Sequence, residues 1–132
     1  MRCVQVLIVG LVLTVGMCLG SCGTEDPALM LVGSWELVEV SITDVDEGDA
    51  FVPSTTGKTL LLDVAGVYTS NGNACSISEG TDIGTTGQWS ATNNVLILSG
   101  CPETIAYTLE GTEMILEFAC LENCKHKYAL VQ

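Results

Sequence analysis

Cysteine is the residue type with the widest chemistry in this chain, which has seven cysteines and one histidine among its 132 residues. Cys75, Cys101, Cys120 and Cys124 lie in the long, mostly polar part of the chain, and the other three lie within or next to an apolar N-terminal run. A single histidine, His126, cannot build a two-histidine metal site or a proton relay. No serine stands in a nucleophile elbow. We therefore predict that the protein is not an enzyme and needs no cofactor.

Cys22 ends a pattern that is typical of exported proteins. The uncharged run Val4 to Leu19 follows one basic residue, Arg2, and leads into Gly20-Ser21-Cys22. A basic start, an apolar run and small residues before a cleavage point are the layout of a secretory signal. The stretch Leu19 to Cys22 resembles a bacterial lipobox, which implies cleavage before Cys22 and a diacylglycerol on its thiol. The alternative is a membrane-spanning anchor, for which this run lies near the lower limit of about 17 residues.

The resemblance to a lipobox also implies how the chain is divided and where it resides. Residues 1–21 are then a signal peptide, 22–32 a lipidated tether with a short plug, and 33–132 one domain, since the remainder is too short for two. Within the tether, Asp26-Pro27 predicts a helix cap and first turn that close the lower end of the domain. Gly23 stands where aspartate would signal retention in the inner membrane. We therefore expect an anchor in the outer membrane, on its periplasmic or its surface-exposed face.

The charge of the chain restricts its partners. Sixteen acidic residues face four basic ones, for a net charge of −12. After residue 22 the basic residues are Lys58, Lys125 and Lys127. Such a surface repels nucleic-acid phosphates and anionic lipids. We expect no nucleic-acid partner, and a charged partner would be a basic protein or a cation.

Asp44, Asp46 and Asp49 are weak candidates for calcium ligands. Asp44-x-Asp46 resembles the start of a calcium loop, but Gly48 comes one position early and Thr55 stands where a bidentate glutamate is needed. The alternative is a solvated acidic loop. We predict no metal site of higher affinity.

The rest of the chain has the pattern of strands and tight turns. Segments rich in β-formers alternate with turn residues such as Asn93-Asn94, which suits a hairpin. We predict an all-β fold, an eight-stranded antiparallel up-and-down barrel preceded by a helical signal peptide. The predicted strands are 33–42, 59–64, 67–70, 85–90, 95–99, 104–110, 114–119 and 125–131.

Three short motifs occur in a recognisable order. They are Gly33-Ser34-Trp35, then Leu61-Leu62-Asp63-x-x-Gly66-x-Tyr68, then Gly87-Gln88-Trp89. Together they resemble the lipocalin-like domain of bacterial lipoproteins, over nearly all of the chain after residue 22. True lipocalins usually place an arginine late in the chain over the first-strand tryptophan, and this chain has none there. The resemblance therefore implies a lipocalin-like barrel rather than a lipocalin proper.

In an up-and-down barrel, alternate connections lie at the same rim. The longer connections, 43–58, 71–84, 100–103 and 120–124, all fall on one rim and contain the four remaining cysteines. An even number of cysteines in a small exported domain indicates disulfides. A four-thiolate zinc site is the alternative, but it lacks a second close pair. Three connectivities are open; Cys120 and Cys124 flank a hairpin loop, and pairing them would leave Cys75 with Cys101.

The interior of an eight-stranded barrel is either filled by side chains or holds one small ligand. The candidates for a ligand pocket are the inward aromatic and aliphatic residues Trp35, Leu37, Leu62, Tyr68, Trp89, Leu96, Tyr107, Phe118 and Tyr128. Two functions remain open: a monomer that binds a small apolar ligand at an acidic mouth, or a non-catalytic interaction or inhibitor module whose acidic rim loops dock a basic partner. His126, between two lysines, is predicted to be exposed.

Overall fold

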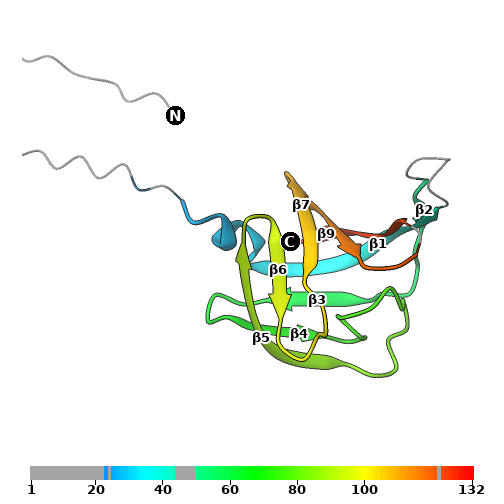
Figure 1. Cartoon of the computed structure of the whole chain (residues 1–132), viewed down its shortest axis with the longest axis horizontal. Helices are drawn as coiled ribbons and strands as arrows, with labels where there is room; N and C mark the ends of the chain where they lie inside the picture. Colours follow the sequence, from blue (N-terminus) through cyan, green and yellow to red (C-terminus); the bar gives the residue numbers. More distant parts are fainter. Residues whose placement is uncertain (1–22, 24, 44–49, 122) are drawn as a thin grey trace, which may run out of the picture.

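Short strands joined by tight turns make an antiparallel meander that closes on itself (Figure 1). The computed structural model describes residues 23, 25–43, 50–121 and 123–132. In these residues one 3₁₀ helix precedes nine strands, and none of the helical structure is long and apolar enough to cross a membrane. The elements are η1 (Pro27–Leu31), β1 (Gly33–Thr43), β2 (Val52–Pro53), β3 (Thr59–Leu62), β4 (Val67–Ser70), β5 (Thr85–Thr92), β6 (Val95–Leu98), β7 (Ile105–Glu110), β8 (Glu113–Phe118) and β9 (Asn123–Val131).

Pairing of the first and last strands closes the barrel. Neighbours along the sheet run β1-β3-β4-β5-β6-β7-β8-β9, all antiparallel, and β1 pairs with β9 from Ser34↔Val131 to Thr43↔Asn123. A bulge between Leu37 and Glu39 interrupts this register. Closure leaves no long unpaired edge, which is the usual protection against edge-to-edge association.

The predicted fold is confirmed: an all-β, eight-stranded up-and-down barrel with each predicted strand present to within a few residues. The prediction missed β2, which lies inside the segment taken as a plain connection, 43–58. β2 pairs with Glu39 and Val40 of β1. β3 pairs with the earlier part of β1, Gly33 to Glu36, so β2 and β3 bind successive parts of β1. A two-residue strand containing Pro53 has too little alternation to be recognised. The predicted signal peptide, Cys22 and the acidic residues Asp44, Asp46 and Asp49 lie outside the described residues.

Alternation along each strand sends one set of side chains into a single core. Trp35, Leu62 and Tyr128 are at most 1% exposed. Gly87 allows the inner wall to pack closely, because a Cβ there would lie 2.3 Å from Ser99 Oγ and 2.8 Å from the Tyr68 ring. In the two-residue loop of the β5–β6 hairpin, Asn93 and Asn94 both adopt positive φ, as their type predicts.

A short helix covers one end of the barrel, which we call the lower end. Asp26 caps η1 by accepting a hydrogen bond from the Ala28 amide at 3.0 Å, and Pro27 opens it. Leu31 is fully buried, and its carbonyl accepts a hydrogen bond from Trp35 Nε1 at 2.9 Å. η1 and β2 lie at opposite ends (Figure 1). The end that carries β2 and the four cysteines is the upper rim.

Leu62 and its neighbour Leu61 provide a matched test of which face of β3 is the core. Leu62 is fully buried and Leu61 is 43% exposed. Leu62→Ala should lower the free energy of unfolding by about 3 kcal/mol, because it removes buried methyl groups and leaves a cavity. Leu61→Ala should cost less than about 1 kcal/mol. Urea denaturation of both variants measures the difference; equal losses would contradict the strand register.

Candidate functional site

A long connection, residues 71–84, lies across the upper rim and is held there from two sides. Ser54, which follows β2, is hydrogen-bonded to the Glu79 carboxylate. Cys75 forms a disulfide with Cys101, in the connection between β6 and β7. The loop also packs tightly on itself, since a Cβ on Gly72 would lie 2.3 Å from the Gly80 carbonyl oxygen.

Of the three connectivities that the sequence left open, the structure has the one that pairs Cys75 with Cys101 and Cys120 with Cys124. Cys75–Cys101 spans the rim with a Cα–Cα distance of 5.2 Å, and Cys120–Cys124 closes the β8–β9 hairpin with a Cα–Cα distance of 6.2 Å. Oxidised cysteines leave no thiolates for a zinc site at these positions. Among the described residues, no group of three histidine, cysteine or acidic side chains is placed to hold a metal ion.

Lys58 is buried beneath the loop, which the sequence analysis did not foresee. Its side chain is fully covered, and Nζ donates hydrogen bonds to the Ser78 carbonyl at 2.5 Å and the Ser76 carbonyl at 3.3 Å. Burial lowers the pKa of Lys58 from 10.5 to about 8, and the negative charge of Glu79 opposes that shift. The signal was its spacing: Lys58 has the same strand phase as Leu60 and Leu62, which point inward.

The prediction that His126 is exposed is wrong. His126 is 2% exposed because it shares the inward phase of β9 with Cys124 and Tyr128, and its flanking lysines point outward. Its ring lies 5.0 Å from the Phe118 ring. Nε2 lies 3.0 Å from the Ile77 carbonyl oxygen and must carry the proton, since a carbonyl can only accept. Nδ1 is buried with no hydrogen-bond partner among the described residues.

Lys58 and His126 together bind three successive loop carbonyls, those of Ser76, Ile77 and Ser78. Burial first, and then the positive charge of Lys58, lower the pKa of His126 from 6.5 to about 4. The histidine is therefore neutral at pH 7, and the ammonium is the charged member of the pair. Two inward side chains thus fasten the loop over the mouth of the barrel.

The predicted pocket residues divide between the core and the surface hollows. Trp35, Leu37, Leu62, Leu96 and Tyr128 are at most 1% exposed and belong to one packed cluster, against which half-buried Trp89 also packs. Tyr68, Tyr107 and Phe118 each also line a hollow at the rim or the lower end. The barrel interior around these residues is occupied by side chains. Ligand contact by any of the nine stays a prediction.

One hollow at the upper rim is mainly apolar, and we call it the mouth pocket. It has a volume of about 260 Å³ and lies between the 71–84 loop and the upper ends of β7 and β8. Ile105 and Phe118 form its buried part, and Ile77 lines it from the loop. One cysteine of each disulfide lies at its edge. The lining residues are Cys75, Ser76, Ile77, Pro102, Glu103, Thr104, Ile105, Phe118, Ala119 and Cys120.

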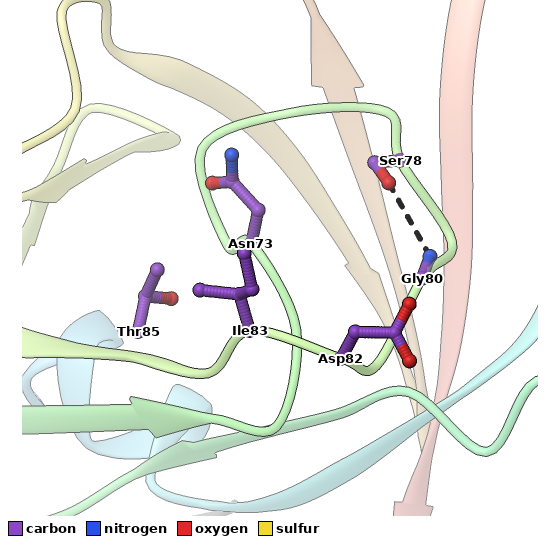
Figure 2. Close-up of a pocket in the computed structure, with 6 residues that line it drawn as sticks. All are labelled: Asn73, Ser78, Gly80, Asp82, Ile83 and Thr85. Atoms are coloured by element: carbon purple, nitrogen blue, oxygen red, sulfur yellow. Dashed lines mark hydrogen bonds between the residues drawn. The ribbon is translucent and has the colours of Figure 1, made fainter.

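A second hollow lies within the curl of the loop itself (Figure 2). It has a volume of about 300 Å³ and is lined by Asn73, Ser78, Gly80, Asp82, Ile83 and Thr85. Several of its polar groups serve the loop: Ser78 Oγ accepts from the Gly80 amide, Asn73 Oδ1 accepts from the Cys75 amide, and Thr85 Oγ1 donates to the Gly72 carbonyl. We therefore assign this hollow to loop structure.

The upper rim and the strands beside it are poor in uncompensated positive charge. Of the three lysines in the described part of the chain, Lys58 is buried, Lys125 is 3.5 Å from Glu117, and Lys127 is ion-paired with Glu39. Lys127 also lies 4.4 Å from the centre of the Phe51 ring. Exposed pairs of this kind add little stability. They do leave the described surface acidic.

No protein-family model and no curated protein sequence matches this chain.

Acid should destabilise the barrel between pH 6.5 and 4. His126 titrates near 4 in the fold and near 6.5 in an unfolded chain. In that window the unfolded state binds more protons, so the free energy of unfolding falls as the pH falls. At 1.36 kcal/mol per pKa unit, the free energy of unfolding should fall by about 3 kcal/mol over this range. Urea denaturation between pH 7 and pH 4 measures it.

His126→Gln is the control for this pH dependence. Glutamine keeps a donor for the Ile77 carbonyl and does not titrate. The stability of this variant should therefore fall less steeply than that of the natural protein over the same pH range. Identical slopes would contradict a buried, neutral His126.

Proposed function

We propose that this protein is an exported, lipid-anchored member of the lipocalin-like barrel class that binds a small apolar molecule in the mouth pocket and catalyses no reaction. The mouth pocket is the observation that carries the proposal. Its walls come from three separate segments, and the Cys75–Cys101 disulfide and the buried Lys58 hold one of them in place. A preformed, mostly apolar hollow is the usual form of a small-molecule site.

The size and lining of the pocket favour a small ligand. A volume of about 260 Å³ lies just below the range, from about 300 Å³, in which drug-sized molecules are bound. Ile77, Ile105 and Phe118 favour an apolar or aromatic body, and Thr104 and Ser76 offer hydroxyl groups at the edge. Glu103 would disfavour an anionic group there. We therefore expect a neutral or cationic ligand with a compact apolar part.

A second candidate is a basic protein partner, docked on the acidic surface. The ion pairs of Lys125 and Lys127 favour it, since they consume the exposed positive charge of the described residues. Such docking is steered by long-range attraction and weakens as salt screens it. A complex with a basic partner that persists unchanged in 1 M salt would speak against this candidate.

Native mass spectrometry of the protein isolated from its own host tests ligand binding. We expect the folded chain to carry a small apolar molecule. Ala119→Trp should abolish that extra mass, because Ala119 lines the mouth pocket at an exposed position. Ala106→Trp is the matched control, since Ala106 is exposed on β7 outside the pocket. A natural protein without a bound molecule, or full occupancy in Ala119→Trp, would contradict the proposal.

The lipid anchor has its own test. The mature chain should begin at Cys22 and have the added mass of acyl groups, and it should partition into the detergent phase of a Triton X-114 separation. Cys22→Ser should abolish both properties, because serine offers no thiol for the thioether. A mature chain that starts elsewhere, or an unmodified Cys22, would disprove the anchor.

A further inference from the structure

Exposed apolar side chains gather at the lower end of the barrel. Met30 on η1 is 60% exposed and Val64, in the β3–β4 turn, is 78% exposed. Neighbouring positions at the same end are also apolar and exposed. We call the set the apolar collar; it consists of Leu29, Met30, Leu61, Val64, Val67 and Val131.

The strand register joins Leu61 and Val131 across β1, and Met30 lies around the same end of the barrel, beside Asn94 and Gly111. Ser34 pairs with Leu61 on one side and with Val131 on the other, so these two side chains flank the same residue of β1. Val67 opens β4 directly after the turn that contains Val64, and its carbonyl accepts a hydrogen bond from the Asp63 amide at 3.0 Å. η1 lies at this end too, fixed by the buried Leu31. Apolar positions that are close together on an exposed surface indicate an interaction site rather than chance exposure.

Charged residues are distributed unevenly among the strands of the barrel wall. The strands β3, β4, β5 and β6 contain no charged residue, whereas β1, β8 and β9 contain Glu36, Glu39, Glu113, Glu117, Lys125 and Lys127. The strands on this side of the barrel can therefore approach a lipid headgroup layer without desolvating a charge of their own, and Asp63 in the β3–β4 turn is the nearest carboxylate. The carboxylates at the lower end that would remain in water beside that layer are those of Glu25, Asp26, Asp63, Glu110 and Glu113.

The chain leading to the lipid ends at this same surface. Only Gly23 to Asp26 separate Cys22 from η1, a distance of at most about 14 Å when extended. η1 lies against the barrel, where it contacts β5, at the end opposite to β2 (Figure 1). A lipid inserted in a bilayer would hold the lower end within reach of that bilayer.

We infer that the apolar collar rests on the bilayer that holds the Cys22 lipid, so that the barrel stands with a fixed orientation and its mouth pocket faces away from the membrane. The inference rests on the lipid anchor proposed above. Apolar side chains partition into the boundary between headgroups and acyl chains, and they add to the affinity of a lipid anchor. Since β3 and β4, which carry Leu61 and Val67, contain no charged residue and the described lysines are buried or ion-paired, the fitting surface is a zwitterionic membrane.

The fluorescence of the two tryptophans can report on this contact, because both indoles lie at the lower end. Trp35 Nε1 donates a hydrogen bond to the Leu31 carbonyl, and Trp89 Nε1 donates one to the Asp63 carbonyl, each at 2.9 Å. The acylated full-length mature protein is reconstituted in phosphatidylcholine vesicles with brominated acyl chains, which quench nearby indoles. We expect strong quenching, and none for Cys22→Ser mixed with the same vesicles.

Single substitutions distinguish the contribution of the collar to membrane contact from that of the lipid tether. Met30→Asp and Val64→Asp should each shift the equilibrium from the seated to the detached barrel about tenfold, because an apolar side chain leaves the bilayer. Their quenching should fall while the protein still floats with the vesicles. Ile83→Asp is the control: Ile83 is 77% exposed at the opposite end, and its substitution should change nothing. Thermal unfolding confirms that each variant is folded.

The outcomes distinguish the inference from the proposal beneath it. An acylated protein that floats with the vesicles but is not quenched, or that is quenched equally in Met30→Asp and Val64→Asp, overturns the seating and leaves the anchor intact. A mature chain without acyl groups on Cys22 overturns both. Strong quenching that is lost only in the two collar variants establishes the collar as the membrane contact.

Discussion

The buried ammonium group of Lys58 is the constraint on which the upper half of the molecule depends. A charge removed from water must be compensated, and the nearest groups able to do this belong to the 71–84 loop. The carbonyls of Ser76 and Ser78 turn inward to accept its hydrogen bonds, and Glu79 supplies the negative charge. That arrangement fixes Ile77 between them. His126 and the mouth pocket both depend on where Ile77 lies.

The barrel could be predicted from the sequence because its determinants are local. Alternation within each strand, the turn residues Asn93 and Asn94, and the lengths of the connections are all visible in a single chain, and they gave the strand order and the rim that holds the cysteines. The pairing of Cys75 with Cys101 was one of three connectivities that the sequence left open, and the structure decides it. β2 was not predicted because a strand of two residues is too short to show an alternation of apolar and polar side chains.

The candidate site was less predictable, since it depends on what charged side chains do when their strand phase turns them inward. His126 was predicted to be exposed because of its flanking lysines, and no position was predicted for Lys58, whereas alternation with Tyr128 and with Leu60 places both side chains inside. Hydrogen bonds to carbonyls of the 71–84 loop compensate for that burial. The sequence of a fourteen-residue loop does not show which way its carbonyls point. The mouth pocket is lined in part by the same loop, so its lining residues could not be predicted from the sequence either.

Closure between β1 and β9 joins the beginning of the domain to its end, through residue pairs from Ser34↔Val131 to Thr43↔Asn123. Contacts of such sequence separation form late, because the intervening chain must first be ordered. In the exported protein proposed above, β1 would cross a membrane before β9 does, and its edge facing β9 would stay unpaired until residues 123–131 arrive. If the protein is exported as proposed, its barrel would close only after secretion is finished. A lipid on the N-terminal side would keep the waiting chain at the membrane surface.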